Sequence, residues 1–196
     1  MKIIKYPSKN QWPDIVKRPH LDLSQLNATV KNVLDDVKAH GDEAVRHYEQ
    51  QFDHVSLDSL AVSEEEIEEA FQTISTELKA SLELAHHNIA AFHEAQRFEG
   101  KKIETAPGVD CWQKSVPIEK VGLYIPGGTA PLFSTVLMLA TPAKIAGCKE
   151  IVLCTPPNRE GKINPAILAA ARIAGVEHIY KAGGVQAIGA MAYGTE

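Results

Sequence analysis

The hydrophobic pattern of the chain changes near residue 105. Before that point, apolar residues recur three or four positions apart, which is the spacing of one face of an α-helix. The longest such stripe predicts the longest helix of the chain, from about Thr76 to Phe98. Its apolar members are Leu78, Leu82, Ala85, Ile89 and Phe92.

Shorter stripes predict further helices in the first part of the chain. A stripe from Leu26 to Val37 is followed by Gly41, which we expect to end the first helix, and a second helix runs over Asp42–Phe52. Ser63 with Glu66 three residues later forms a capping box and predicts the start of another helix. We expect these helices to pack as a bundle or against the second part of the chain.

After Gly100 the pattern becomes that of strands. A hairpin is predicted from Lys101–Thr105 and Val109–Val116, with a turn at 106–108. Three apolar runs then alternate with helical segments. They are Val121–Ile125, Ile151–Thr155 and Glu177–Lys181.

This alternation is typical of a parallel sheet with crossover helices. We therefore predict an α/β protein with an N-terminal helical region, residues 1–105, and an incomplete Rossmann-like parallel βαβαβα sheet, residues 106–196. Three strands are few for a self-contained α/β domain, so we expect the sheet to be unfinished. The first helix of this region, which follows Thr129 and Pro131 and ends at Gly147, is apolar nearly all round, which predicts burial on more than one side.

Composition and charge exclude several classes of protein. The chain is 44% hydrophobic and 23% charged, which is close to the average of folded, water-soluble proteins. Its net charge is −5 and it has no basic block, so we expect no nucleic-acid partner. No signal peptide is recognisable, and Pro142 interrupts the longest apolar run, so we expect no membrane association. With three cysteines and no CxxC spacing, these features predict a cytoplasmic protein.

Two glycine doublets follow the first and third predicted strands. They are Gly127-Gly128 and Gly183-Gly184, and ligands bind beyond the carboxyl ends of the strands in open parallel sheets. One interpretation is a nucleotide or phosphate site at the helix N-termini, and the other is that the glycines only make tight turns. Neither doublet completes the GxGxxG pattern, so an ordinary dinucleotide fingerprint is not supported.

Two polar side chains lie near these doublets. Tyr124 precedes the first doublet by two residues, and Gln186 follows the second by two. Both could reach a ligand, Tyr124 by stacking or through its hydroxyl and Gln186 through its amide, although a packed tyrosine and a solvated glutamine are the alternatives. No two histidines have the i, i+4 spacing of a helical zinc pair, and we interpret the cysteines as packing residues. We therefore name no catalytic residue and no metal ligand in this chain.

The stretch from Val121 to Met138 reads VGLYIPGGTAPLFSTVLM and closely resembles histidinol dehydrogenase. The resemblance continues through Ala140–Cys148, Leu153–Pro157 and Ala182–Ile188, and it extends loosely into the N-terminal helices. Val185 stands where that family more often has alanine.

The resemblance implies a homodimeric, zinc-dependent enzyme that oxidises L-histidinol to L-histidine through histidinaldehyde in two NAD-dependent steps. It also implies that Tyr124 and Gln186 contact NAD. Members of the family are considerably longer, and their zinc ligands, acid/base pair and most substrate contacts follow the part that this sequence matches. We therefore expect an N-terminal portion that is inactive alone and self-associates. A stand-alone nucleotide- or phosphate-binding module without catalysis is the alternative.

Overall fold

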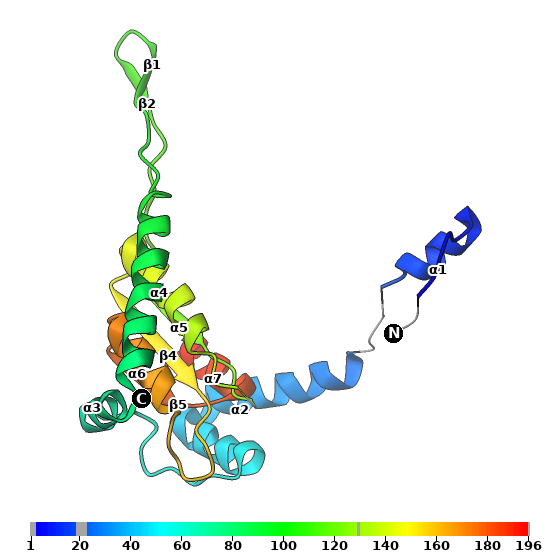
Figure 1. Cartoon of the computed structure of the whole chain (residues 1–196), viewed down its shortest axis with the longest axis vertical. Coiled ribbons are helices and arrows are strands. Elements are labelled where there is room, and N and C mark those ends of the chain that lie inside the picture. The colour runs from blue at the N-terminus through cyan, green and yellow to red at the C-terminus, as the bar shows by residue number, and fades with distance from the viewer. Residues whose placement is uncertain (1–2, 19–22, 129, 196) are drawn as a thin grey trace.

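A three-stranded parallel sheet forms the centre of the molecule (Figure 1). The computed structural model describes residues 3–18, 23–128 and 130–195. The sheet order is β3 (Lys120–Tyr124), β4 (Glu150–Thr155) and β5 (His178–Lys181), so β4 lies in the middle. The predicted α/β class with a short parallel sheet is confirmed.

One face of the sheet is covered by two layers of helices. The crossover helices α5 (Phe133–Ala146) and α6 (Pro165–Ile173) lie against the sheet. Outside them, α4 (Thr76–Glu94) packs on α5 and α3 (Glu64–Thr73) packs on α6. The early helices therefore pack against the second part of the chain, which was one of the two arrangements expected.

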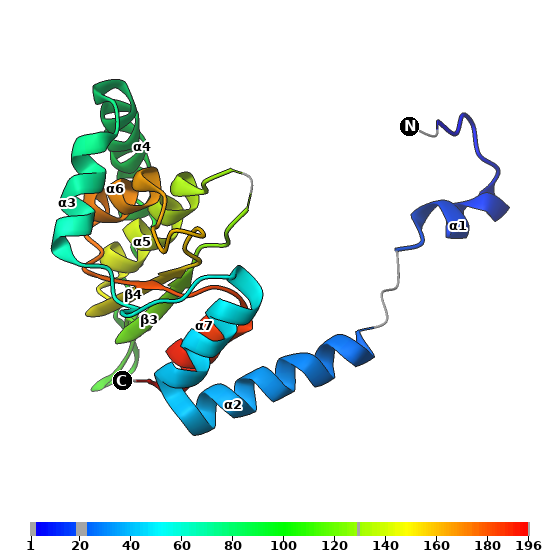
Figure 2. The same cartoon turned by 90° about the horizontal axis from the view of Figure 1, so that it is seen from below.

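The other face is covered by α2 (Ser24–Tyr48) and α7 (Gly184–Tyr193), which lie side by side (Figure 2). Strand residues alternate between the two faces because successive side chains of a strand point in opposite directions. Leu123, Leu153 and Ile179 belong to the core under α5 and α6. Tyr124, Cys154 and Tyr180 belong to the core under α2 and α7. Helix α7, which follows β5, thus lies on the opposite face of the sheet from the crossover helices α5 and α6.

Helix α2 bends sharply at Gly41, which has a φ of 56°. The predicted interruption at this glycine is confirmed, although the helix resumes directly behind the kink. It continues as a π-helical turn, η2 (Glu49–Asp53), which ends at His54 in the left-handed conformation. Gly41 divides the 25 residues of α2 into two shorter segments, 24–40 and 42–48. The 19-residue α4 is therefore the longest uninterrupted helix of the described residues, as predicted.

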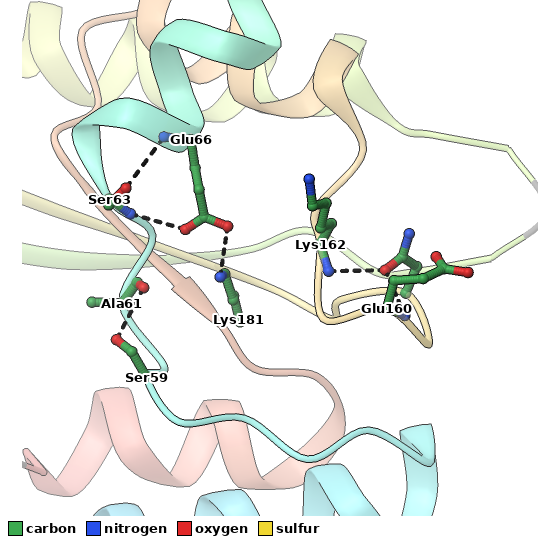
Figure 3. A network of polar contacts seen from close by, with 8 residues as sticks. Ser59, Ala61, Ser63, Glu66, Glu160, Lys162 and Lys181 are labelled. Carbon is green, nitrogen blue, oxygen red and sulfur yellow. Dashed lines mark hydrogen bonds and ion pairs between the residues drawn. The ribbon is translucent and has the colours of Figure 1, made fainter.

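Helices α3 and α4 begin as the sequence indicates. The capping box is formed, because the Glu66 N–H donates to the Ser63 hydroxyl and the Ser63 N–H donates to the Glu66 carboxylate (Figure 3). The same carboxylate accepts a hydrogen bond of 2.7 Å from Lys181 at the end of β5. Helix α4 ends at Glu94, one turn before the predicted Phe98, which is 53% exposed and packs on no core.

The predicted hairpin forms between β1 (Ile103–Ala106) and β2 (Val109–Cys111). Strand β2 ends well before the predicted Val116, because β1 has only four residues to pair with it. The hairpin projects from the body (Figure 1). A short 3-10 turn, η1 (Lys9–Gln11), and helix α1 (Trp12–Val16) lie apart from the other described elements.

Helix α5 begins at Phe133, with Leu132 as its N-cap, and the predicted cap residue Thr129 lies outside the described residues. Gly147 ends the helix at a φ of 88°, as expected. The predicted burial on more than one side is confirmed, because α5 contacts β3, α4 and α6. Met138 and Leu139 nevertheless stay 50% and 38% exposed. The reason is that α5 covers β3, which is an edge strand within the described part of the chain.

Strand β5 is covered at its outer edge. The backbone of residues 60–62 bonds to it, through Val62 N–H to the Ile179 carbonyl and Lys181 N–H to the Leu60 carbonyl. None of the helices in the described ranges has the length and apolarity that a bilayer crossing requires.

Candidate functional site

A cavity of about 910 Å³ lies beyond the carboxyl ends of the three parallel strands. Its lining comes from the loops that follow β3, β4 and β5 and from the turn after α2. Both predicted ligand residues, Tyr124 and Gln186, line it together with both glycine loops. The parallel arrangement therefore brings together two side chains that are 62 positions apart in the sequence, as expected for an open parallel sheet.

Tyr124 is the last residue of β3 and links two of these loops. Its hydroxyl oxygen accepts a hydrogen bond of 3.0 Å from the Gly184 N–H. The ring is partly buried on the face of the sheet that α2 and α7 cover. Tyr124 thus forms one wall of the cavity and holds the start of α7 in place.

Gln186 lies in the first turn of α7 and is fully buried, which differs from the solvated alternative. Its Nε2 donates a hydrogen bond of 2.9 Å to Oε1 of Glu49. Its Oε1 is buried and accepts no hydrogen bond from the described residues. A buried oxygen without a donor is costly, so this atom is suited to accept a hydrogen bond from a bound molecule.

Glu49 is the residue that sequence reasoning missed. It begins the π-helical turn after α2 and is fully buried. Its Oε1 also accepts a hydrogen bond of 2.8 Å from the Gly183 N–H. Glu49 follows Val45 by four residues and therefore lies on the apolar face of that helical segment. The sequence signal that could have identified Glu49 is a carboxylate within an apolar stripe.

The surroundings of Glu49 disfavour its charge. Burial raises the pKa of Glu49 above that of an ordinary glutamate, and the nearby Asp53 carboxyl raises it further. The Gly183 N–H and the Gln186 amide act in the opposite direction by donating to the carboxylate. Its second oxygen, Oε2, has no hydrogen-bond partner within the described ranges.

The second glycine loop is held by these contacts. The Gly183 N–H binds Glu49 and the Gly184 N–H binds Tyr124. Gly184 has a φ of 52°, and a Cβ there would lie 2.8 Å from Oε1 of Gln186, so the position requires glycine. Two N–H groups that a phosphate would need are thus already bound within the protein.

The first glycine loop is less constrained. Gly127 lies close to Pro156, because a Cβ would be 2.6 Å from its Cγ, whereas Gly128 faces open space at a φ of 152°. No side chain of the described residues caps the start of α5. Of the described residues that line the cavity, Lys162 is basic and Asp53 is acidic.

Cysteine and metal chemistry find little support around the cavity. Burial, with a smaller effect of Glu49, raises the pKa of the Cys154 thiol to about 12, so it is not an activated nucleophile. Its interpretation as a core residue is confirmed, since it is buried in β4, and Cys111 lies on β2 as expected. Within residues 3–18, 23–128 and 130–195, no three His, Cys, Asp or Glu side chains group as a metal site.

Comparisons with known proteins agree with the resemblance in the sequence. Residues 16–196 match the family model described as histidinol dehydrogenase. The chain is 66% identical over 196 residues to histidinol dehydrogenase of Bacteroides fragilis, covering 100% of this chain and 46% of that protein. It is 50% identical over 187 residues to the Escherichia coli K12 protein of the same name, covering 95% of this chain and 42% of that protein.

A solved structure gives the same result. The crystal structure of histidinol dehydrogenase from Elizabethkingia anophelis superposes with a TM-score of 0.92 at 48% identity, covering 97% of this chain and 44% of that chain. The chain spans about half the length of the curated relatives that it matches. The chain belongs to the histidinol dehydrogenase family.

Proposed function

We propose that this chain forms the NAD-binding part of an enzyme that oxidises L-histidinol to L-histidine through histidinaldehyde, in the last steps of histidine biosynthesis. The observation that carries the proposal is the meeting of Tyr124 and Gln186 at one cavity, beyond the strand ends where parallel sheets bind nucleotides.

The residues around the cavity suit a nucleotide. Tyr124 offers a ring and a hydroxyl, Gln186 offers a buried acceptor oxygen without a partner, and Lys162 offers a positive charge for a phosphate. When bound, NAD would supply the hydride acceptor for the alcohol and, after addition of water, for the aldehyde, so two NAD molecules would be reduced for each acid formed. This chain's own residues would bind and orient the cofactor.

Zinc is part of the proposed enzyme by family resemblance, and we propose that this chain does not supply its ligands. We propose that the isolated chain is catalytically silent, because the resemblance implies that the zinc ligands and the acid/base pair follow the part of the family that this chain matches. We also propose that it works in the cytoplasm.

A homodimer is the proposed assembly. Large apolar side chains are exposed on the N-terminal segment, including Trp12 at 50% and Val16 at 73%, and such groups favour association. Light scattering at micromolar concentration tests this: we expect a dimer or larger species, and a monodisperse monomer contradicts the proposal.

Titration of the purified chain with NAD, followed by NMR, tests the cofactor site. We expect weak, saturable binding that moves resonances of residues 124–128 and 183–186. Binding in the micromolar range, near −8 kcal/mol, would instead favour the alternative of a finished, stand-alone nucleotide module. NADH formation from zinc, NAD and histidinol by this chain would contradict its proposed inactivity.

A further inference from the structure

We infer that Glu49 is a positioning residue of the cofactor cavity. Its carboxyl group fixes the Gln186 amide so that the amide oxygen faces a donor group of the cofactor, an N–H or O–H of a carboxamide or ribose. This inference rests on the proposed NAD site. Gln186 would thus recognise a donor group of the cofactor, and Glu49, which lies outside the glycine loops, would make this recognition possible.

The orientation of the Gln186 amide follows from the chemistry of its partner. Oε1 of Glu49 already accepts the Gly183 N–H at 2.8 Å. The atom of Gln186 that lies 2.9 Å from the same oxygen must therefore be a donor, which identifies it as Nε2. The other end of the amide, Oε1, is then fixed as an acceptor, and a glutamine in this position cannot present its N–H₂ group to the cavity.

The amide oxygen of Gln186 has no hydrogen-bond donor among the described residues. Gln186 is fully buried, and its Oε1 accepts no hydrogen bond within the described part of the chain. This oxygen lies close to Gly184, since a Cβ added there would come within 2.8 Å of it. Both residues line the 910 Å³ cavity. An unpaired acceptor beside such an opening is completed by a ligand donor.

The same contacts exclude the phosphates of the cofactor from this loop. A phosphate needs donors, and the Gly183 and Gly184 N–H groups are bound to Glu49 and Tyr124. An acceptor oxygen such as Oε1 of Gln186 would repel a phosphate. The phosphates are therefore expected on the side of the cavity formed by Gly128 and Lys162.

The test compares substitutions of two glutamates by NAD titration of the 196-residue chain. Glu49→Leu removes the acceptor and frees the Gln186 amide, and we expect NAD binding to weaken about tenfold, as for one lost hydrogen bond. Glu49→Gln keeps an acceptor oxygen, and we expect affinity within about threefold of wild type. Glu66→Leu is the matched control, because it removes an acceptor from Lys181 outside the cavity.

The control separates positioning from stability. Glu66→Leu also breaks a contact to the segment that leads into the second glycine loop, so it destabilises the fold without touching Gln186. We expect its NAD affinity to be unchanged. Equal affinity of Glu49→Leu and wild type, equal weakening in Glu66→Leu, or failure of Glu49→Gln to restore affinity each overturns the inference.

A measurement on the wild-type chain covers the case that Glu49→Leu does not fold. On saturation with NAD, the side-chain carbonyl carbon of Gln186 should move downfield, because its oxygen gains a hydrogen bond. If NAD moves other cavity resonances and leaves this carbon unchanged, the inference is wrong while the proposed function stands. If NAD moves no resonance, the cofactor site itself is wrong and the inference falls with it.

Discussion

The two glycine loops have similar sequences and different roles. In the second loop, the first N–H groups of α7 bind Glu49 and Tyr124, so the loop is fixed by the protein itself. In the first loop, Gly128 faces open space and α5 begins only at Phe133, without a cap from any described side chain. A glycine doublet after a parallel strand therefore does not by itself predict a phosphate site, because buried side chains can already accept hydrogen bonds from its N–H groups.

Substitution of one glycine in each loop should give the largest contrast. Gly184→Ala forces a left-handed residue at a φ of 52° and brings a Cβ to 2.8 Å from the fixed Gln186 oxygen. We expect a loss of about 3 kcal/mol in the free energy of unfolding, from backbone strain and overpacking together. Gly128→Ala adds strain only, since a Cβ there would meet no atom of the described residues within 4 Å, and it should cost about 1 kcal/mol.

Urea denaturation of both variants measures this difference. If the two losses are equal, Gln186 rotates away freely when Gly184 is substituted, and the second loop is not held as we describe. Both glycine substitutions should also be measured in a Glu49→Leu background. The loss of unfolding free energy caused by Gly184→Ala should be smaller there, because the Gln186 amide is no longer held by Glu49.

Removal of the Tyr124 hydroxyl is the next largest change. Tyr124→Phe leaves the Gly184 N–H without its acceptor, which should lower the free energy of unfolding by about 1 kcal/mol. Tyr180→Phe is the control, because Tyr180 lies on the same face of the sheet and makes no hydrogen bond through its hydroxyl within the described residues. An equal loss in both variants would mean that the hydroxyl of Tyr124 does not hold the second loop.

The sequence predicts most of the elements because local rules determine them. The capping box of Ser63 and the interruption at Gly41 depend on neighbours within four residues, and both are formed. Tyr124 and Gln186 meet at one cavity because carboxyl ends of parallel strands share an edge. The boundary near residue 105 stays a prediction.

What the sequence does not predict depends on contacts between distant residues. Glu49 lies 134 positions before Gly183, and no local pattern joins them. The same holds for the exposure of Met138, which depends on what covers the far side of α5. A buried carboxylate becomes understandable only when its donors are known, and these come from another part of the chain.

The pH dependence of stability provides a smaller test of the second loop. Since burial raises the pKa of Glu49, folding takes up a proton between its unfolded and folded values. The contribution of Glu49 is therefore fully present below its unfolded pKa and is lost as the pH rises through its folded pKa. Wild type should lose stability relative to Glu49→Gln over that range.

Urea denaturation of both proteins at a series of pH values checks this. Other acids, such as Asp36, whose pKa is lowered mainly by its hydrogen bond with His40, titrate equally in both proteins and cancel. A difference in stability that stays constant with pH would mean that Glu49 keeps an ordinary pKa and is less enclosed than its contacts indicate.

Cysteine alkylation should give the smallest effect and reports on the closure of the same loop. Cys154 is buried in the cluster that contains Ala182, and its thiol has a pKa of about 12, so iodoacetamide should modify exposed Cys111 first and Cys154 only when the structure opens. Loosening of the second loop by Glu49→Leu should raise the rate at Cys154 several-fold, while the half-buried Cys148 on the opposite face keeps its rate. Mass spectrometry of the labelled peptides measures all three thiols in one sample. A uniform increase at Cys148 and Cys154 would indicate global destabilisation, whereas an increase confined to Cys154 means that Glu49 closes this loop locally.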